Sequence, residues 1–513
     1  MTAPMGRLAG AVVVVALGVR VLYLFVRYTL GVAGTERFHV ETWAVIFLAA
    51  GLTLRVAQSS RPQPEPAPSA AFPEVSYWWW VVFCALAIAL YRPALAVGFL
   101  SDDFVLVSHA SRWDIGPVTP ALFRPIPLAA WAVLLQAGAG AAALHLLSVL
   151  LHGTNAYLTV RIVGGWVGDR GWSFLAGLVV LAAPLAPEAV VWLSGVFDLL
   201  ATTLVLTCIL IARRYGNPTP AATRIQFVAV GLAAVASKET AAVAGGLVLL
   251  DAWARGRWPR PLLVDTGILI VTVGVFGLMR LEAAFGMAGP PVSWYVLQRA
   301  LFGTFGALAV PWHAEVIDRL PWLPILAVAA LLYLLLAFFL ERDGTKQRTR
   351  LAIAAAFWAL IPIVPVFPIL FVAPDLQQSR YLYMSAVGWA ALIALVASRR
   401  RGGPLHRVPL AVVGGIIAVH SYGTPMHLDP WIEAGLLRDR VESSARGSGM
   451  DKCPTIILSN LPDSVRGAYV FRNGGPEAFA RDLRLNAVLG DAGGRCSFRW
   501  SGTRLSFIPF GTE

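Results

Sequence analysis

Charge is scarce in this sequence. Asp, Glu, Lys and Arg make up 14% of the 513 residues, whereas 57% of the residues are hydrophobic. Ordinary soluble domains carry about 25% charged residues, so this chain does not belong to that class. Apolar runs of about 18 residues or more are typical of membrane-spanning helices, and such runs recur between residues 9 and 421. The sequence therefore predicts an all-α polytopic membrane protein.

Cysteine is also scarce, with four in the whole chain, and no Cys/His spacing is typical of a metal site. Cys84 and Cys208 lie in apolar runs and are predicted to be inert. Cys453 and Cys496 lie in the polar tail, where a disulfide could form if the tail is extracytoplasmic. No Gly-rich phosphate loop or nucleophile motif is convincing.

The formal net charge of +12 does not indicate a nucleic-acid partner. Many of the basic residues stand in short loops between apolar segments, where the positive-inside rule places them on the cytoplasmic side of a membrane. Membrane lipids are therefore the expected surroundings. The predicted cytoplasmic loops are 212–224, 254–261, 341–350 and 398–407.

Four parts follow along the chain. Residues 1–58 are predicted to hold two transmembrane helices, and residues 59–76 are a linker rich in Pro, Ala and Ser. Residues 77–424 form the main transmembrane domain. Residues 425–513 alternate short apolar runs with Gly and Pro, which predicts a small α+β domain on the extracytoplasmic side.

The basic loops determine the predicted topology. Because 254–261 and 341–350 are both placed inside, the segments 262–281 and 322–340 cross the membrane, and 295–310 is expected to be re-entrant or interfacial. The total is about 13 spans of the cell membrane, with the N-terminus on the cytoplasmic side and the C-terminus on the extracytoplasmic side. Further spans are expected at about 141–163, 172–186, 193–212, 225–236, 240–253, 351–373, 381–397 and 408–421.

The unusual charged motifs all fall on the predicted outer side. Asp102 and Asp103 follow the apolar run that ends at Leu100, and ionisable residues near membrane depth are functional candidates. The alternative is that they mark the water boundary, or that Asp102 caps a short helix. The other motifs on this side are Pro187-Glu188, Ser237-Lys238-Glu239 and Gln377-Gln378-Ser379-Arg380.

The basic motifs each have two interpretations. Lys238 could bind a phosphate in a partly dry site, or form a structural ion pair at a helix break. Arg380 precedes Tyr381 and Tyr383, so it could hold a lipid phosphate beside aromatic surfaces, or simply anchor a helix at the interface.

Three further polar residues stand in or beside apolar segments. Glu188 stands at the end of a span, where a carboxylate can simply be exposed to water. Asp198 is instead expected about one turn into the membrane. His145 and His152 are seven residues apart and share a helix face, together with Asn155. Interhelical hydrogen bonding is favoured for the two histidines over a metal or catalytic role.

Taken in order, these motifs resemble the GT-C glycosyltransferases, in the branch of the protein O-mannosyltransferases and the related transmembrane O-mannosyltransferases with tetratricopeptide repeats. The resemblance covers about residues 78–400. It departs at Val196, where relatives tend to have Arg, and no tetratricopeptide repeats follow. The series is Phe99-Leu100-Ser101-Asp102-Asp103-Phe104, Phe123-Arg124-Pro125, His145, His152, Asn155, Ala183-Pro184, Pro187-Glu188, Val190, Trp192, Ser194-Gly195, Asp198-Leu199-Leu200, Ser237-Lys238-Glu239 and Arg380-Tyr381-Leu382-Tyr383.

The resemblance implies a membrane enzyme that transfers a sugar, with mannose as the first choice, from a polyprenyl-phosphate donor to a protein or glycan hydroxyl, with inversion. By motif match Asp102 is the general base, and Asp103 orients it or binds the acceptor. No cofactor is certain, although a divalent cation such as Mg²⁺ or Mn²⁺ could bridge Asp103 and Glu188. The donor phosphate would be bound by Lys238, Arg380 and Arg124. The substrate pocket would contain Glu188, Asp198, Glu239, Tyr381, Tyr383 and His152.

A transporter or flippase for a lipid-linked glycan is the main alternative. Such folds often show internal repeats and discontinuous helices near the midplane, whereas no repeat is evident here and the charged motifs gather on one side. A third interpretation is an inactive relative whose outer domain binds cell-wall glycan.

Overall fold

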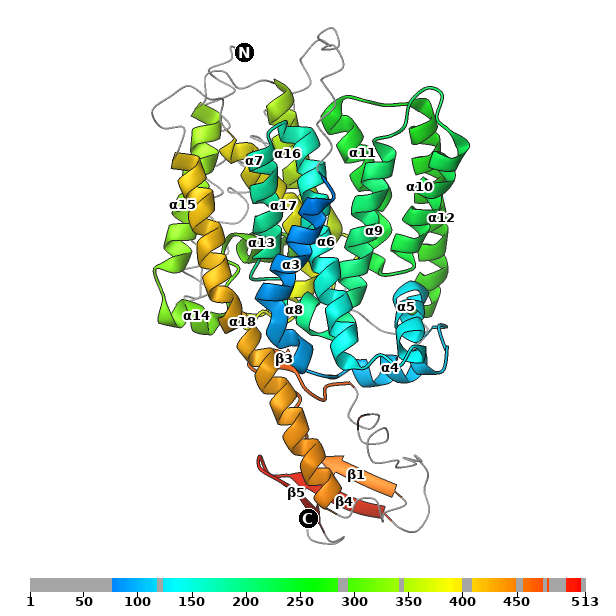
Figure 1. Ribbon diagram of the computed structural model, residues 1–513, viewed down its shortest axis with the longest axis vertical. Helices are drawn as coiled ribbons and strands as arrows, with labels where there is room; N and C mark the ends of the chain where they lie inside the picture. Colours follow the sequence, from blue (N-terminus) through cyan, green and yellow to red (C-terminus); the bar gives the residue numbers. More distant parts are fainter. Residues whose placement is uncertain are drawn as a thin grey trace.

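A computed structural model describes residues 76–117, 123–284, 294–340, 346–398, 408–448, 455–473, 478 and 495–508. The two predicted N-terminal helices, almost all of the linker, and Cys453 lie outside the described residues. Within the described part the protein is mostly helical, with a few short strands near the C-terminus (Figure 1). Cys84 and Cys208 are buried free thiols, as expected from their apolar surroundings.

The described helices follow the apolar runs of the sequence. Five helical segments are long and apolar enough to cross a membrane: Trp78–Ala96, Ala141–Val167, Leu193–Ala212, Ser379–Ala397 and Val408–Arg446. The helices are α3 Trp78–Tyr91, α4 Asp103–Ser111, α5 Pro125–Gln136, α6 Ala141–Val167, α7 Arg170–Leu181, α8 Pro187–Val191, α9 Val196–Ala212, α10 Ala221–Val235, α11 Ala244–Arg255, α12 Arg260–Ala284, α13 Trp294–Ala309, α14 Ala314–Arg319, α15 Leu323–Leu340, α16 Lys346–Leu360, α17 Tyr383–Ala397 and α18 Val408–Gly447.

Two apolar segments are shorter helices than the sequence predicts. The expected segment 172–186 ends as α7 at Leu181, and the chain then turns into the single-turn helix α8. The expected segment 351–373 is helical only through α16 and the short 3₁₀ helix η4 at Ile361–Ile363. Pro362, Pro365 and Pro368 explain this ending, because proline removes a backbone donor and clashes with the preceding turn.

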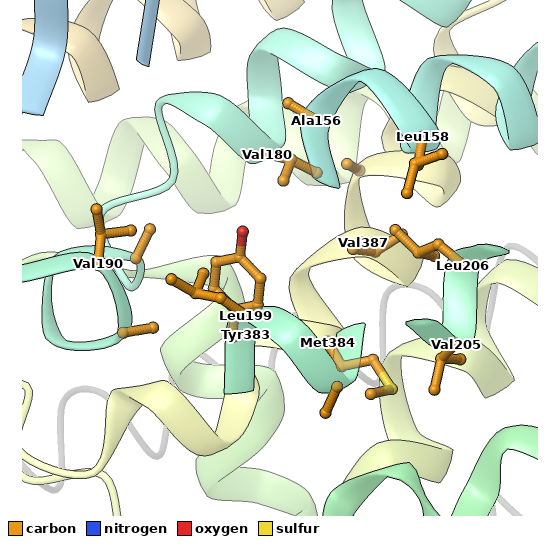
Figure 2. Close-up of a cluster of buried hydrophobic side chains, with 14 of the residues drawn as sticks. Ala156, Leu158, Val180, Val190, Leu199, Val205, Leu206, Tyr383, Met384 and Val387 are labelled. Atoms are coloured by element: carbon orange, nitrogen blue, oxygen red, sulfur yellow. The ribbon is translucent and has the colours of Figure 1, made fainter. Parts of the chain in front are cut away.

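The core lies where α6, α7, α8, α9 and α17 meet (Figure 2). Its apolar side chains include Ala156, Val180, Leu199 and Val387, and the Tyr383 ring lies among them. The helices approach closely at glycine: a Cβ at Gly388 would lie 2.5 Å from Ala359 N. This close packing of α17 against α16 holds fixed the short 3₁₀ helix η5, Ser379–Leu382, which leads into α17.

The motif segments gather at one end of the helix bundle. Figure 1 shows α4, α5 and α8 at its lower end, together with the start of α9. The described basic connections, α9 to α10 and α11 to α12, lie at the opposite end. There Arg213 and Arg255 pair with the buried Asp251, and Arg224 pairs with Asp265. The separation of the two ends therefore agrees with the charge pattern of the sequence.

The tail begins with a helix that is much longer than the predicted span 408–421. Residue 425, where the sequence predicts the start of the tail domain, lies within α18, which continues past Pro425 and Pro430 to Gly447. Strands β1 (Thr455–Ser459) and β4 (Arg495–Trp500) are parallel, and β4 pairs antiparallel with β5 (Leu505–Ile508). A separate hairpin joins β2 (Ser464–Val465) to β3 (Ala468–Tyr469). This hairpin docks on the bundle rather than on the sheet.

Candidate functional site

The two adjacent aspartates have different surroundings. Asp103 is fully buried: its Oδ2 accepts from Leu100 N at 2.9 Å, and its Oδ1 accepts from Ser194 N at 2.9 Å and Ser194 Oγ at 2.6 Å. Burial raises the pKa of Asp103 to about 7, against the opposing effect of these donors. Asp102 is half-buried and has one weak contact, at 3.5 Å from Ser101 Oγ. Asp103 therefore ties α4 to the start of α9, whereas Asp102 keeps its lone pairs available.

Glu188 on α8 joins three distant parts of the chain. Its Oε1 accepts from Gln378 N at 3.1 Å, Arg380 Nη1 at 2.5 Å and Tyr469 Oη at 3.3 Å. Its Oε2 accepts from Ser379 Oγ at 3.1 Å and Arg380 N at 2.9 Å. Five donors saturate the carboxylate, so Glu188 holds η5 and the tail hairpin β2–β3 against the bundle.

Lys238 forms a buried ion pair with Asp198. The Lys238 ammonium contacts Asp198 Oδ2, and both side chains are almost fully buried. Lys238 has an extended backbone, φ −162° and ψ 150°, directly before the short 3₁₀ helix η3, Glu239–Val243. Burial lowers the pKa of Lys238 to about 8, with the Asp198 carboxylate acting in the opposite direction.

Arg380 lies beside the same carboxylate. Its Nε is 4.0 Å from Asp198 Oδ2, in addition to the ion pair with Glu188. The guanidinium stacks 4.4 Å from the Trp192 ring centroid and 4.9 Å from that of Tyr381. Lys238 Nζ lies 4.7 Å from the centroid of the same Tyr381 ring, so two cations contact one aromatic side chain.

Arg124 completes the basic side of the site. It forms a two-point contact with Glu239, with Arg124 Nη2 2.9 Å from Oε2 and Nε 3.3 Å from Oε1. Burial pushes the pKa of Glu239 upward, but the Arg124 guanidinium outweighs that effect and the pKa is lowered. The backbone contact of Ile126 N with Ala236 O, at 3.5 Å, brings the two segments together.

His152 and Tyr383 form a hydrogen-bonded group with Asn155 between α6 and α17. His152 Nε2 donates to Leu181 O at 3.0 Å, and its Nδ1 accepts from Tyr383 Oη at 2.6 Å. Asn155 Nδ2 also donates to Tyr383 Oη, at 3.3 Å. His145 Nε2 donates to Gly98 O at 3.0 Å. The interhelical hydrogen bonding favoured for the two histidines is present for His152, which bonds to α7 and α17, whereas His145 bonds to the loop residue Gly98. His152 and Tyr383 are both buried, so neither side chain offers an exposed surface to the predicted substrate pocket.

The motif series included Ser194 and Trp192 without giving either a role: Ser194 holds Asp103, and Trp192 Nε1 donates to Leu100 O at 3.2 Å. The tail residues that reach this region did not stand out in the sequence. From the tail, Tyr469 reaches Glu188, and Val470 O accepts from Ser101 N at 2.8 Å. Only the short apolar run 468–471 marked the hairpin in the sequence, and nothing there indicated its partner.

The residues do not fit the bridging cation considered for Asp103 and Glu188. The five donors on Glu188 occupy the lone pairs that a cation would need, and three donors leave at most one free lone pair on Asp103 Oδ2. Across the described parts of the chain, no group of three His, Cys, Asp or Glu side chains has an arrangement that could hold a metal ion.

Comparison of the chain with protein-family models and with curated proteins found no match.

Proposed function

We propose that this protein is a membrane glycosyltransferase of the GT-C type, which moves a sugar from a polyprenyl-phosphate donor to an acceptor hydroxyl with inversion. Mannose is the proposed sugar, and a protein or glycan hydroxyl is the proposed acceptor. The proposal rests on the resemblance of the ordered motifs, and on one observation: Lys238 and Arg380, from separate segments, converge on Asp198 and both contact the Tyr381 ring.

This convergence suits a phosphate that gains charge as it leaves. Lys238, Arg380 and Arg124 carry three positive charges, and their carboxylate partners Asp198, Glu188 and Glu239 carry three negative ones. The arrangement is neutral before the donor binds, so a bound phosphate would compete with Asp198 for Lys238. The cations then stabilise charge that develops in the transition state, within a region of low dielectric.

Sugar transfer exchanges one bond at the anomeric carbon for another. The acceptor oxygen forms a bond to this carbon, while the bond from the carbon to the phosphate oxygen breaks and the polyprenyl phosphate leaves with the electron pair. Asp102 takes the proton of the acceptor hydroxyl, because it is the carboxylate of the pair with free lone pairs. Asp103 acts as a positioning residue that holds the loop and Ser194.

The proposed topology has about 13 spans, with the N-terminus inside and the site outside the cell membrane. The apolar helices and the basic connections at the far end of the bundle support this placement (Figure 1). The tail would then be extracytoplasmic, a setting that permits a disulfide between Cys453 and Cys496.

The test is sugar transfer from radiolabelled polyprenyl-phosphate-mannose by liposomes that contain the purified chain. The variants are Asp102→Asn and Lys238→Ala. Asp114→Asn is the control, because this exposed carboxylate belongs to the same segment and pairs only with His109 in the described contacts. Loss of a general base lowers the rate about 10²- to 10⁴-fold, so Asp102→Asn should lose transfer while Asp114→Asn keeps it.

Each outcome decides a separate point. If no sugar is transferred from mannose, glucose or arabinose donors and labelled lipid moves across the bilayer, the protein is a transporter and the proposed enzyme function is wrong. Full activity in Asp102→Asn would leave the enzyme but remove Asp102 as the base. Full activity in Lys238→Ala would remove Lys238 from the donor phosphate.

A further inference from the structure

The tail hairpin β2–β3 contacts both segments that carry the proposed chemistry. In Figure 1 its strand β3 lies at the lower end of the bundle, beside α18 and apart from β1, β4 and β5. Residues 468–471, which are β3 and the two residues after it, are all buried. A single hairpin of two short strands is only marginally stable by itself, so this one depends on the groups that it contacts.

Tyr469 is the contact with the Arg380 side of the site. Its hydroxyl donates to Glu188 Oε1 at 3.3 Å, the same oxygen that accepts from Arg380 Nη1. Burial raises the pKa of Tyr469 to about 12, so the hydroxyl is protonated and acts as the donor. Arg380 Cζ lies 6.0 Å from the centroid of the Tyr469 ring. The guanidinium therefore contacts three rings, those of Trp192, Tyr381 and Tyr469.

The shared oxygen determines how strongly Glu188 holds Arg380. Glu188 Oε1 accepts from three donors, and the Tyr469 hydroxyl is one of them. Each donor offsets part of the negative charge of the carboxylate, so removal of the hydroxyl would strengthen its attraction for Arg380. A phosphate that binds Arg380 must compete with that carboxylate. The Tyr469 hydroxyl therefore favours phosphate binding, although it lies on the opposite side of Glu188.

The end of the hairpin holds the segment that presents Asp102. Val470 O accepts from Ser101 N at 2.8 Å, and the Phe471 ring stacks on Phe104 with 6.4 Å between centroids and 14° between planes. Ser101 has φ +51°, in the left-handed region that a residue with a Cβ disfavours. This backbone conformation sets the direction of the residue that follows, Asp102. The hairpin therefore helps to fix where the proposed base points.

The turn of the hairpin is anchored separately. Arg466 Nε donates to Glu315 Oε1 on α14 at 2.7 Å, and Arg466 Nη1 donates to Glu433 Oε2 on α18 at 3.3 Å. The Arg466 carbonyl accepts from His313 Nε2 at 3.2 Å. Within the hairpin, Val470 N donates to the carbonyl of Asp463 at 2.9 Å. The hairpin is thus held at its turn and at its end, which lets it act as a fixed support.

We propose that the tail hairpin is part of the active site. Tyr469 is a positioning residue for Arg380, and Val470 and Phe471 position the segment of Asp102. The inference rests on the proposed function, in which Arg380 binds the donor phosphate and Asp102 takes the proton of the acceptor. The tail then takes part in sugar transfer, although none of its residues contacts the reacting atoms. Neighbouring residues of one hairpin should consequently affect different kinetic parameters.

Tyr469→Phe tests the contact with the donor side. Phenylalanine keeps the ring beside Trp192 and removes only the hydroxyl. The dissociation constant of polyprenyl phosphate is measured by native mass spectrometry of the full chain in lipid nanodiscs, and the KM for polyprenyl-phosphate-mannose is measured in the transfer assay. Both should rise about tenfold, the effect of a hydrogen bond to a charged group, and kcat should stay at the wild-type value.

Phe471→Leu tests the contact with the Asp102 segment. Leucine keeps an apolar side chain but removes the ring that stacks on Phe104. Because a small displacement of a catalytic group is costly, kcat should fall about 10- to 100-fold, while the dissociation constant of polyprenyl phosphate stays unchanged. Asp463→Asn is the control. It changes an exposed ion pair with Arg472 at the base of the hairpin, and it should leave both parameters unchanged.

The two variants must differ in the parameter that changes. Loss of folded protein alone would lower kcat in both and leave the dissociation constant of Tyr469→Phe at the wild-type value, which would overturn the inference. A wild-type kcat in Phe471→Leu would overturn it as well.

Failure of the proposed function gives a different result. A wild type that binds polyprenyl phosphate but transfers no sugar would contradict the enzyme. In that case Tyr469→Phe should still weaken polyprenyl phosphate binding, and unchanged binding would overturn the role of the hairpin too. A wild type that does not bind polyprenyl phosphate would refute both proposals.

Discussion

Glu188→Gln tests the connection between α8, η5 and the tail hairpin. Glutamine keeps the size of the side chain but converts one acceptor oxygen into an NH₂ group that faces donors. If Oε2 is replaced, Arg380 N loses its acceptor, whereas the Ser379 hydroxyl can still donate to Leu185 O at 3.2 Å; if Oε1 is replaced, three donors lose theirs. At about 1–3 kcal/mol for each unsatisfied buried donor, the loss is at least about 1 kcal/mol. Unpairing the buried Arg380 gives a similar figure of about 3–5 kcal/mol.

The assay is thermal unfolding followed by tryptophan fluorescence, with hydrogen exchange of the hairpin residues 464–471 as a local measure. Asp463→Asn is the matched control, because its ion pair with Arg472 is largely exposed, at 55% and 37% for the two side chains. Such a surface pair contributes about 0–1 kcal/mol. An equal, small effect of Glu188→Gln and Asp463→Asn on unfolding and on hairpin exchange would refute this account of Glu188.

Three further predictions concern single positions. Lys238 is protonated below its lowered pKa of about 8, so the KM for the donor should stay low at pH 6.5 and rise above about pH 8. In Lys238→Arg the cation stays charged, so this rise should be absent when KM is measured across the same pH series. Asp198→Asn should cost about 3–5 kcal/mol in chemical unfolding, and the double variant Asp198→Leu/Lys238→Met should recover most of it, since both charges are then absent. Gly467→Ala should cost about 2 kcal/mol or more in the same assay, because Gly467 has φ +87° and a Cβ there would lie 2.3 Å from Asp375 O; a neutral result would show that the hairpin is not held against this loop.

The helix positions could be predicted from the sequence, because apolar runs and prolines act locally. The start of α6 follows directly from the apolar run after Gly140, whereas the predicted span 351–373 was too long, because the prolines that begin at Pro362 end the helix there. The length of α18 could not be predicted in this way. Pro425 and Pro430 are local signals for an end, and contacts with the bundle and the tail outweigh them.

The members of the site could be predicted better than their partners. The charged residues of the site were all named from the motifs, although their pairings were not, and the structure gives adjacent residues different partners, as Asp102 and Asp103 and then Lys238 and Glu239 show. The pairing of Lys238 with Asp198, 40 residues earlier, is set by how α9 and η3 meet in three dimensions. Sequence spacing holds no record of such a contact, and the same is true of Tyr469, which reaches Glu188 from 281 residues away.

The length of α18 determines how far the tail sheet stands from the helix bundle. The helix has 40 residues, so at about 1.5 Å per residue it is about 60 Å long, twice the roughly 30 Å of a hydrocarbon core. The sheet is attached at its far end, where Leu505 N donates to Ser444 Oγ at 2.7 Å (Figure 1). The helix thus holds the sheet beyond the end of the bundle, and the short link from Ser459 of β1 to Ser464 of the docked hairpin is a second tether that fixes this separation.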